Sequence, residues 1–399
     1  MGKKNENKIA INCLAFVLIF WGEICFYKEE TLIIYILITA TGIGLSFWKN
    51  WGMISSRIKR DNVVIWLTLI YLLFFFNGIF RLRKGDFNWD TLGYRYVEII
   101  ALFLIISSLL LEGMKEFEKV CAVVGGLSIA YLLYEEYDII LAGGTRIGDS
   151  LSGNVNVVGY NFGILSTLMI WFYCQEKRLW KLAFFAGFSG CALATGSKKV
   201  LIMLVLDAVI YFWYEKNRMT GWLKVLFFLV ALLILVFKVP YLYNIIGERT
   251  INMLKTMLYG TSNQWYSHST DVRESMIQEA LLFFTENPIL GGGWNYFYAH
   301  TAYEYEYSHC NYTEILCSFG IVGAVLFYSR YIYNIIVACE YQKTKRYNNL
   351  CILIMVLMVE ALVLDWAAVT FSAQCVWYLP VIISAAAVDT IHQKELSVL

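Results

Sequence analysis

The chain has 399 residues, of which 59% are hydrophobic and 16% charged, and its mean hydropathy is +0.58. This composition excludes a soluble globular protein, and a formal net charge of +1 points to no charged partner such as nucleic acid. We therefore expect a polytopic membrane protein, in which each helix that crosses the bilayer needs roughly 20 apolar residues.

The apolar stretches predict an all-α fold of about twelve transmembrane helices, forming a single domain over residues 1–399. The polar residues 1–8 resemble the start of a signal peptide. The apolar run after them is long and is followed by no small-residue cleavage site, so we interpret it as a retained first span. The expected spans are 9–27, 31–48, 63–80, 96–111, 119–141, 155–174, 180–195, 199–214, 222–240, 312–338, 349–368 and 373–391.

The distribution of lysine and arginine predicts the orientation of these spans. If the N-terminus lies inside, the inner segments carry more Lys and Arg than the outer ones, so both termini are expected in the cytoplasm. The outer segment 241–311 is then far longer than any other connection. Long loops in compact proteins are often functional, and we expect this extracytoplasmic loop to have its own structure.

The loop contains a sequence typical of an amphipathic helix, "STDVRESMIQEALLFFTENP" (269–288). Asp271 is the expected N-cap, with Glu274 three residues later as in a capping box, and Pro288 ends the helix. We expect it to lie across the outer mouth of the bundle. The residues that would form its apolar face, at spacings of three and four, are Ile277, Ala280, Leu281 and Phe284.

Arg273 would then occupy the first helical turn, where the helix dipole opposes a cation. Two interpretations are open. Asp271 and Glu274 can compensate the charge, or the guanidinium and the free N–H groups of the helix N-terminus can together bind a phosphate.

Polar and aromatic residues crowd into "NPILGGGWNYFYAHTAYEYEYSHCNYTEIL" (287–316). His300 and His309 lie in it, and His268 lies upstream, so three of the chain's four histidines gather here. A histidine with an ordinary pKa of about 6.5 can accept a proton at neutral pH. His309 is the candidate base, and a hydrogen-bonded structural histidine is the alternative.

Four stretches carry a resemblance to a known family: "TRIGDSLSGNVNVVGYNFG" (145–163), "LATGSKKVLIMLVL" (193–206), "RESMIQEALLFFTENPILGGGWNYF" (273–297) and "SHCNYTEILCSFGIVGAVLF" (308–327). In this order they resemble the O-antigen ligase and polymerase family of bacterial membrane glycosyltransferases. In that family an Arg, a helix and Pro-x-Leu-Gly-x-Gly precede His-Asn or His-x-Asn and a span that opens with Gly-x-x-Gly. The matching pieces here are Arg273, "NPILGGG", "HCN" and "GIVG" (320–323), and the resemblance runs from about 145 to 335.

The resemblance implies transfer of a glycan from an undecaprenyl-diphosphate lipid to an acceptor hydroxyl. The reaction would take place on the outer face of the cytoplasmic membrane, in O-antigen- or capsule-type polysaccharide biosynthesis. By the same resemblance His309 would be the catalytic base, supported by Asn311 and Glu314. The expected partners are the lipid-linked donor, the glycan acceptor, membrane lipid and other polysaccharide assembly proteins; neither a cofactor nor a nucleic acid is expected.

The resemblance also implies that Arg273 and Arg146 hold the diphosphate. Where the family often has Ser-Arg, this chain has Ser197 followed by Lys198 and Lys199, which keep the charge without the bidentate fork of arginine. The loop's Arg249 is a further candidate ligand. Cations placed where phosphate charge develops stabilise the transition state, although each can instead be a solvated or paired charge.

We interpret the chain as a metal-independent glycosyltransferase, because it contains no Asp-x-Asp motif. Glu304 and Glu306 alternate with tyrosines, and a rim that contacts sugar hydroxyls is favoured over a metal site. Polymerase is favoured over ligase, since no stretch suggests a surface for a lipid A core. The alternative function is a lipid-linked oligosaccharide flippase or another transporter, which predicts internal repeats and discontinuous helices meeting at mid-membrane. No convincing repeat is present.

Overall fold

The computed structural model describes residues 2–57, 62–80, 89–142, 146–152, 154–215, 218–248, 250–252, 255, 264–302, 307–344, 346–371 and 378–396. Across these ranges every regular element is helical. The long helices are α1 (Gly2–Cys25), α2 (Leu32–Arg57), α3 (Asn62–Phe80), α4 (Trp89–Glu112), α5 (Met114–Glu135), α8 (Val155–Glu176), α9 (Leu179–Ala194), α10 (Lys198–Trp213), α11 (Arg218–Lys238), α16 (Asn311–Gln342), α17 (Asn348–Ala367) and α18 (Leu379–Leu396).

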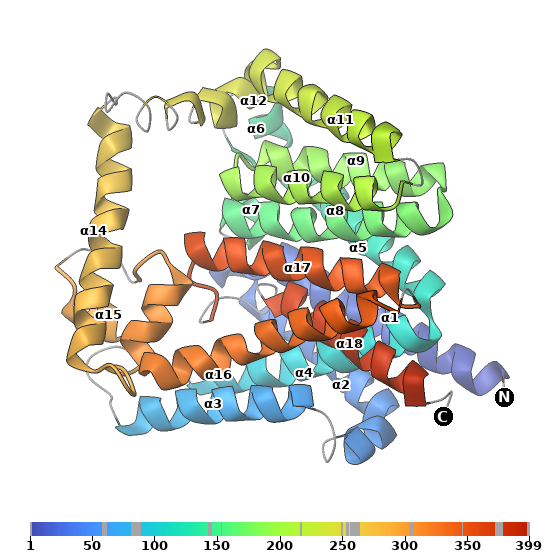
Figure 1. The fold of residues 1–399 in the computed structure, drawn as a ribbon, viewed down its shortest axis with the longest axis horizontal. Helices are drawn as coiled ribbons and strands as arrows, with labels where there is room; N and C mark the ends of the chain where they lie inside the picture. Colours follow the sequence, from blue (N-terminus) through green and yellow to red (C-terminus); the bar gives the residue numbers. More distant parts are fainter. Residues whose placement is uncertain are drawn as a thin grey trace. The chain divides into compact units, whose positions relative to one another are not determined.

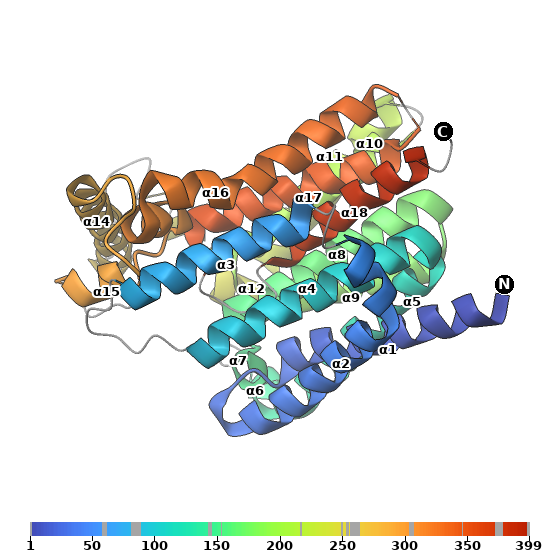
Figure 2. The same cartoon turned by 90° about the horizontal axis from the view of Figure 1, so that it is seen from below.

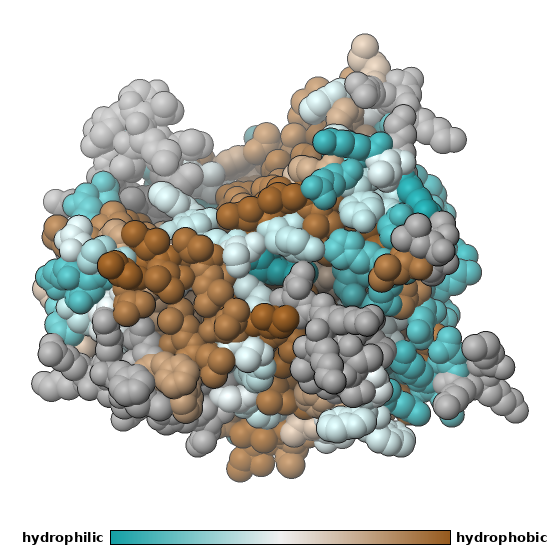
Figure 3. Space-filling model, turned by 60° about the horizontal axis from the view of Figure 1, so that its bottom comes forward, coloured by the Kyte–Doolittle hydropathy of each residue, from teal (hydrophilic) through white to brown (hydrophobic). Residues whose placement is uncertain are grey.

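Each of the twelve expected spans overlaps one of these helices, although residues 373–377 of the last span lie outside the described residues. Eight of them, within the described residues, are long and apolar enough to cross a membrane: α1, α2, α4, α5, α8, α11, α16 and α17. The all-α, multi-pass membrane architecture is therefore confirmed, whereas the count of twelve crossings stays a prediction. Figure 3 shows broad apolar areas on the surface, as expected where lipid is the solvent.

Seven further elements connect these helices in the described residues. They are η1 (Glu29–Thr31), α6 (Tyr137–Ala142), α7 (Asp149–Ser152), α12 (Pro240–Leu242), η2 (Tyr243–Gly247), α14 (Gln264–Glu286) and α15 (Tyr296–His300). The last four fall within or at the edge of the segment 241–311. The chain divides into two compact units, which are described separately. Unit 1 holds residues 1–49, 104–261 and 393–399, and unit 2 holds residues 50–103 and 262–392.

In unit 1 the helices α9, α10 and α5 pack around α8, and α8, α9 and α10 lie side by side (Figure 1). Two glycines of α8 allow the close approach. A Cβ at Gly159 would lie 2.3 Å from Oγ1 of Thr195, and a Cβ at Gly163 would lie 2.6 Å from Sδ of Met203. Small residues at helix contacts serve this purpose in membrane proteins, where packing rather than hydrophobicity holds helices together.

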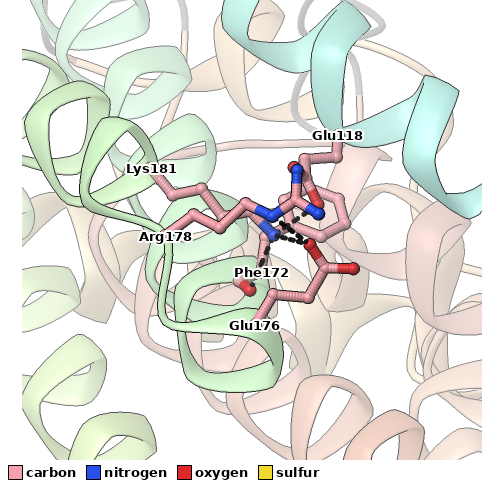
Figure 4. Close-up of polar contacts among 5 residues, drawn as sticks. All are labelled: Glu118, Phe172, Glu176, Arg178 and Lys181. Atoms are coloured by element: carbon pink, nitrogen blue, oxygen red, sulfur yellow. Dashed lines mark hydrogen bonds and ion pairs between the residues drawn. The ribbon is translucent and has the colours of Figure 1, made fainter.

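A buried ion-pair cluster joins three helices at the C-terminal end of α8 (Figure 4). The fully buried Lys181 of α9 places its Nζ 2.6 Å from Oε2 of Glu118 on α5 and 3.3 Å from Oε2 of Glu176 on α8. It also donates to the carbonyl of Phe172 at 3.2 Å. Arg178 contacts Glu176 at 3.0 Å. All three protons of the buried ammonium group thus have acceptors, which is the condition for a charge to be tolerated there.

In unit 2 the central helix is α16, which packs against α3, α14, α15 and α17. Figure 2 shows α3 alongside α16, and the indole N–H of Trp66 donates to the carbonyl of Leu326 at 2.9 Å. One ring from α3, Phe74, is surrounded by three others. Its centroid lies 4.6 Å from that of Phe319, 5.4 Å from that of Trp294 and 5.6 Å from that of Phe371.

The helix α14 runs crosswise at the end of α16 (Figure 1) and begins at Gln264, seven residues before the expected start. Asp271 is therefore not an N-cap, because the helix continues through it toward the N-terminus. The buried positions of α14 are Met276 and Ala280, which pack with Phe297 of α15 and Cys317 of α16. Of the expected apolar face, Ala280 is confirmed and Leu281 is wrong, since it is 40% exposed. The buried face is shifted by one residue from the expected one, because Met276 rather than Ile277 lies on the same side of the helix as Val272.

Candidate functional site

The turn before α16 presents His309 in an unusual backbone conformation. Its φ is +59°, in the left-handed region that non-glycine residues seldom adopt, although His does so more often than most. Ser308 and Cys310 on either side are buried, whereas His309 is partly exposed. A strained residue persists only where its surroundings determine it, and such residues cluster at functional sites.

Hydrogen bonds from both neighbours hold this turn. The backbone N–H of Ser308 donates to Oε2 of Glu314 at 2.7 Å, and its hydroxyl lies 3.1 Å from that of Thr313. The carbonyl of Cys310 accepts from the hydroxyls of Ser308 and Thr313, at 3.1 and 3.2 Å, and from the backbone N–H of Glu314 at 3.0 Å. The buried carboxylate of Glu314 thus has a partner inside the protein, and its role is to hold the turn in which His309 sits.

Asn311, the first residue of α16, is also used inside the protein. Its Oδ1 accepts from the backbone N–H groups of Thr370 and Phe371 at 2.9 and 3.0 Å, and its Nδ2 donates to the hydroxyl of Tyr328 at 3.1 Å. Thr370 in turn donates to Oδ1 of Asp365 at 2.5 Å. Asn311 is buried and therefore fixes the segment after α17 to the start of α16.

The glycine-rich segment 288–293 docks on a break in α16 at Gly320, where φ is +63° and ψ is −162°. Its backbone N–H groups at 292 and 293 donate to the carbonyls of 317 and 318, at 2.8 and 2.9 Å. The N–H groups of 321 and 322 donate back to the carbonyls of 288 and 289, at 2.9 and 3.1 Å. A Cβ at Gly320 would lie 2.4 Å from the carbonyl oxygen of Ile289, and one at Gly291 would lie 2.3 Å from the backbone N of Phe319. The two glycine motifs therefore form one backbone-to-backbone contact.

Arg273 lies on the exposed side of α14 in the third turn of the helix. One of the two open interpretations, with this guanidinium beside free N–H groups of a helix N-terminus, is wrong. Because α14 begins at Gln264, the N–H groups near residue 273 are bonded within the helix. A phosphate-binding role for Arg273 now depends on its charge and exposure alone.

The other histidines and glutamates of the segment are placed as follows. The ring of His300 lies on that of Tyr296, with centroids 4.1 Å apart, and its Nδ1 is 2.9 Å from the carbonyl of Tyr296. His268 lies within α14. Arg249, Glu304 and Glu306 fall outside the described residues. Tyr307 packs edge-on against His309, with centroids 4.7 Å apart.

In unit 1 a second group of predicted residues comes together where α8 and α10 begin. The Nε of Arg146 donates to the carbonyl of Thr195 at 2.6 Å, and its Nη2 donates to Oδ1 of Asn156 at 2.9 Å. Thr195 lies three residues before Lys198, the first residue of α10, and Lys199 follows; both lysines are partly exposed. The structure thus places Arg146 beside the turn that leads into the two lysines.

A residue that sequence reasoning missed, Glu136, holds the segment around Arg146. Its carboxylate accepts from the backbone N–H groups of Gly148 and Ser150, at 2.7 and 2.9 Å. The ammonium group of Lys28 adds a bond to the carbonyl of Ser150 at 2.8 Å. Glu136 lies twelve residues before Gly148, so no local spacing in the sequence could have identified this contact. Ser308 was missed for the same reason, because its hydrogen bond to Glu314 depends on how the turn folds and not on a local spacing in the sequence.

Comparison with known families completes this description. Residues 182–328 match a protein-family model described as O-antigen ligase, and this range includes Lys198, Lys199, Arg273 and His309 but not Arg146. No curated protein matches the chain. The resemblance to the O-antigen ligase and polymerase family is thereby confirmed over residues 182–328 of this multi-pass membrane protein.

Proposed function

We propose that the protein is a metal-independent glycosyltransferase that polymerises lipid-linked oligosaccharide units, with His309 as the base. The imidazole takes the proton of the acceptor hydroxyl while the hydroxyl oxygen bonds to the anomeric carbon of the donor sugar. The bond from that carbon to the diphosphate oxygen breaks, and undecaprenyl diphosphate leaves with the electron pair. The observation that carries the proposal is the left-handed conformation of the partly exposed His309, held between two buried neighbours.

The diphosphate is assigned to the cations of unit 1. The first turn of α10 begins with Lys198 and Lys199, and Ser197 before it forms no side-chain cap. Lys198 and Lys199 at this end are opposed by the helix dipole, a cost that a bound anion removes. The guanidinium of Arg146 lies beside the preceding turn. Arg273, on α14 of unit 2, stays a candidate cation from the sequence resemblance.

The undecaprenyl carrier, the outer face of the cytoplasmic membrane and the preference for polymerisation rest on other support. The family model supports a lipid-linked glycan and an acceptor in general. The excess of Lys and Arg in the inner segments supports a loop 241–311 outside the cytoplasm. We favour polymerisation over ligation, because the sequence offers no stretch that suggests a surface for a lipid A core.

The test is reconstitution of the purified protein with a defined undecaprenyl-diphosphate oligosaccharide, read as chain extension on a gel. We expect extension by the wild type with and without EDTA. His309→Asn is the informative variant, because asparagine accepts the left-handed backbone and cannot act as the base. A general base contributes typically 10²–10⁴-fold, and we expect a loss in that range for His309→Asn and for His309→Ala.

His300→Ala is the matched control, since this exposed histidine of the same segment bonds only locally to Tyr296 in the contacts described above. We expect it to extend chains at close to the wild-type rate. Wild-type rates from His309→Asn would remove the base from the proposal. Transfer to a lipid A core acceptor without chain extension would replace polymerisation by ligation, and loss of activity with EDTA would overturn metal independence.

A further inference from the structure

A cavity of about 150 Å³ lies within unit 1 among α8, α9, α10 and α11. Its wall is mostly apolar and aromatic, formed by Ile170, Leu182, Phe185, Ala208, Val225 and Phe228. It lies toward the C-terminal ends of α8 and α10, and Arg146 lies where these helices begin. It is therefore separate from the residues assigned to the diphosphate.

The buried end of the cavity carries a carboxyl group, that of Asp207. This residue is fully buried, and its Oδ2 accepts from the hydroxyl of Ser166 at 2.9 Å. The hydroxyl of Thr167 also contacts this carboxyl group, and Oδ1 forms no hydrogen bond of ordinary geometry in the part of the chain that the structure describes. A buried polar atom without a partner costs free energy, and an acidic residue inside a membrane segment commonly faces a cavity and marks a binding site.

The solvent-exposed end of the cavity carries positive charge over aromatic rings. The rings of Tyr173 and Tyr211 are stacked with centroids 6.4 Å apart. The Nζ of Lys177 lies 4.9 and 5.0 Å from these two centroids, and the Nζ of Lys224 lies 5.6 Å from that of Tyr211. Glu215 pairs with Lys224 at 2.9 Å. Among the described residues in these contacts, two ammonium groups and one carboxylate leave an excess of one positive charge, and the side chain of Lys224 is 44% exposed.

The two ends are close together. Asp207 and Tyr211 are one turn apart on α10, which separates them by about 6 Å along the helix axis. A matching ligand has a hydrogen-bond donor, a short apolar link and an anionic group within that length. The volume corresponds to about five water molecules, which suffices for a short amino-alcohol.

We propose that this cavity binds the ethanolamine headgroup of a membrane phospholipid. The ammonium group donates to Oδ1 of Asp207 and lies against the aromatic wall, where cation–π attraction adds to the contact. The phosphate stays at the solvent-exposed end of the cavity beside Lys177 and Lys224, and the acyl chains remain in the bilayer. The primary ammonium has three donors, whereas a choline headgroup has none and is three methyl groups larger.

Native mass spectrometry of the delipidated full chain tests the proposal with four phospholipids of identical acyl chains. The headgroups are ethanolamine, monomethylethanolamine, dimethylethanolamine and choline. We expect the bound fraction of the wild type to fall along this series, with at least a tenfold preference for ethanolamine over choline. Equal binding across the series overturns the proposal and needs no variant, so the test stands even if a variant fails to fold.

Three variants then locate the site. Asp207→Asn should abolish the preference for ethanolamine. Phosphatidylglycerol is added as a fifth lipid, and Lys224→Ala should weaken the binding of the ethanolamine lipid and of phosphatidylglycerol alike, because both carry the phosphate. Lys238→Ala, an exposed lysine at the other end of α11, is the matched control and should bind like the wild type. Retention of the preference by a folded Asp207→Asn protein, or tighter binding of phosphatidylglycerol than of the ethanolamine lipid by the wild type, overturns the assignment.

Discussion

The docking of the glycine-rich segment on α16 predicts a large effect of a small change, Gly320→Ala. The backbone at this position has φ +63° and ψ −162°, a region that essentially only glycine occupies. The added Cβ would also lie 2.4 Å from the carbonyl oxygen of Ile289 and 2.6 Å from the backbone N of Gly291. Both neighbours are main-chain atoms, so no side chain can rotate away to make room.

The expected magnitude follows from two costs. Forcing alanine into this conformation costs about 1–3 kcal/mol. Displacing the docked segment removes the backbone hydrogen bonds that join residues 288–293 to residues 317–322, and each contributes about 0.5–1.5 kcal/mol. With the four bonds the sum is a loss of roughly 3–9 kcal/mol, which is a large part of the 5–15 kcal/mol that typically holds a domain folded.

Thermal unfolding in detergent, followed by tryptophan fluorescence, measures this loss, since Trp294 lies just beyond the docked segment. For a unit of this size we expect the Tm of Gly320→Ala to fall by about 6 °C or more, together with loss of chain extension. Gly190→Ala in α9 is the control, because a Cβ there meets open space, and its Tm should not fall, since alanine is favoured over glycine inside a helix by about 0.5–1 kcal/mol. A Gly320→Ala protein with wild-type Tm and activity would refute the docking.

Two further predictions concern charged residues of unit 1. Arg146→Lys should lower the rate of chain extension despite the retained charge, because an ammonium group lacks the planar fork with which the guanidinium donates to Thr195 and Asn156; an unchanged rate would show that the fork is dispensable. Lys181→Met should destabilise the protein by about 3–5 kcal/mol, since it leaves the carboxylate of Glu118 without its buried partner. The second change Glu118→Leu should restore most of the lost Tm, and a double variant no more stable than the single one would contradict the pairing.

The positions of the long helices could be predicted from the sequence, because a membrane imposes a length and an apolar composition on every span. Those constraints act on each segment separately, so no contact between distant residues had to be known. The helix α14 was harder, since its charged face and its glutamates resemble a capped surface helix. Its start at Gln264 instead of Asp271 depends on the polar stretch before it, which follows no apolar periodicity.

Of the candidate site, only the residues that would carry the chemistry could be predicted from the sequence. Resemblance to a family identified His309, Arg146 and the lysines, because such residues recur at fixed places in a motif. It could not show what holds them. The contacts of Glu314 with Ser308 and of Glu136 with Gly148 depend on how the chain turns back on itself, and these carboxylates could as well have faced solvent.

In unit 2 hydrogen bonds connect three motifs that are separate in the sequence: the glycine-rich segment, the start of α16 and the turn at His309. Docking of residues 288–293 fixes the break in α16 at Gly320, and the short helical stretch before that break carries Glu314. Glu314 holds Ser308, which sets the left-handed turn at His309. An imidazole held in a strained turn by a chain of backbone contacts cannot adjust its position independently. A change at Gly320 should therefore misplace the proposed base while leaving every polar residue of the turn present, which is why loss of activity there would report on geometry rather than on chemistry.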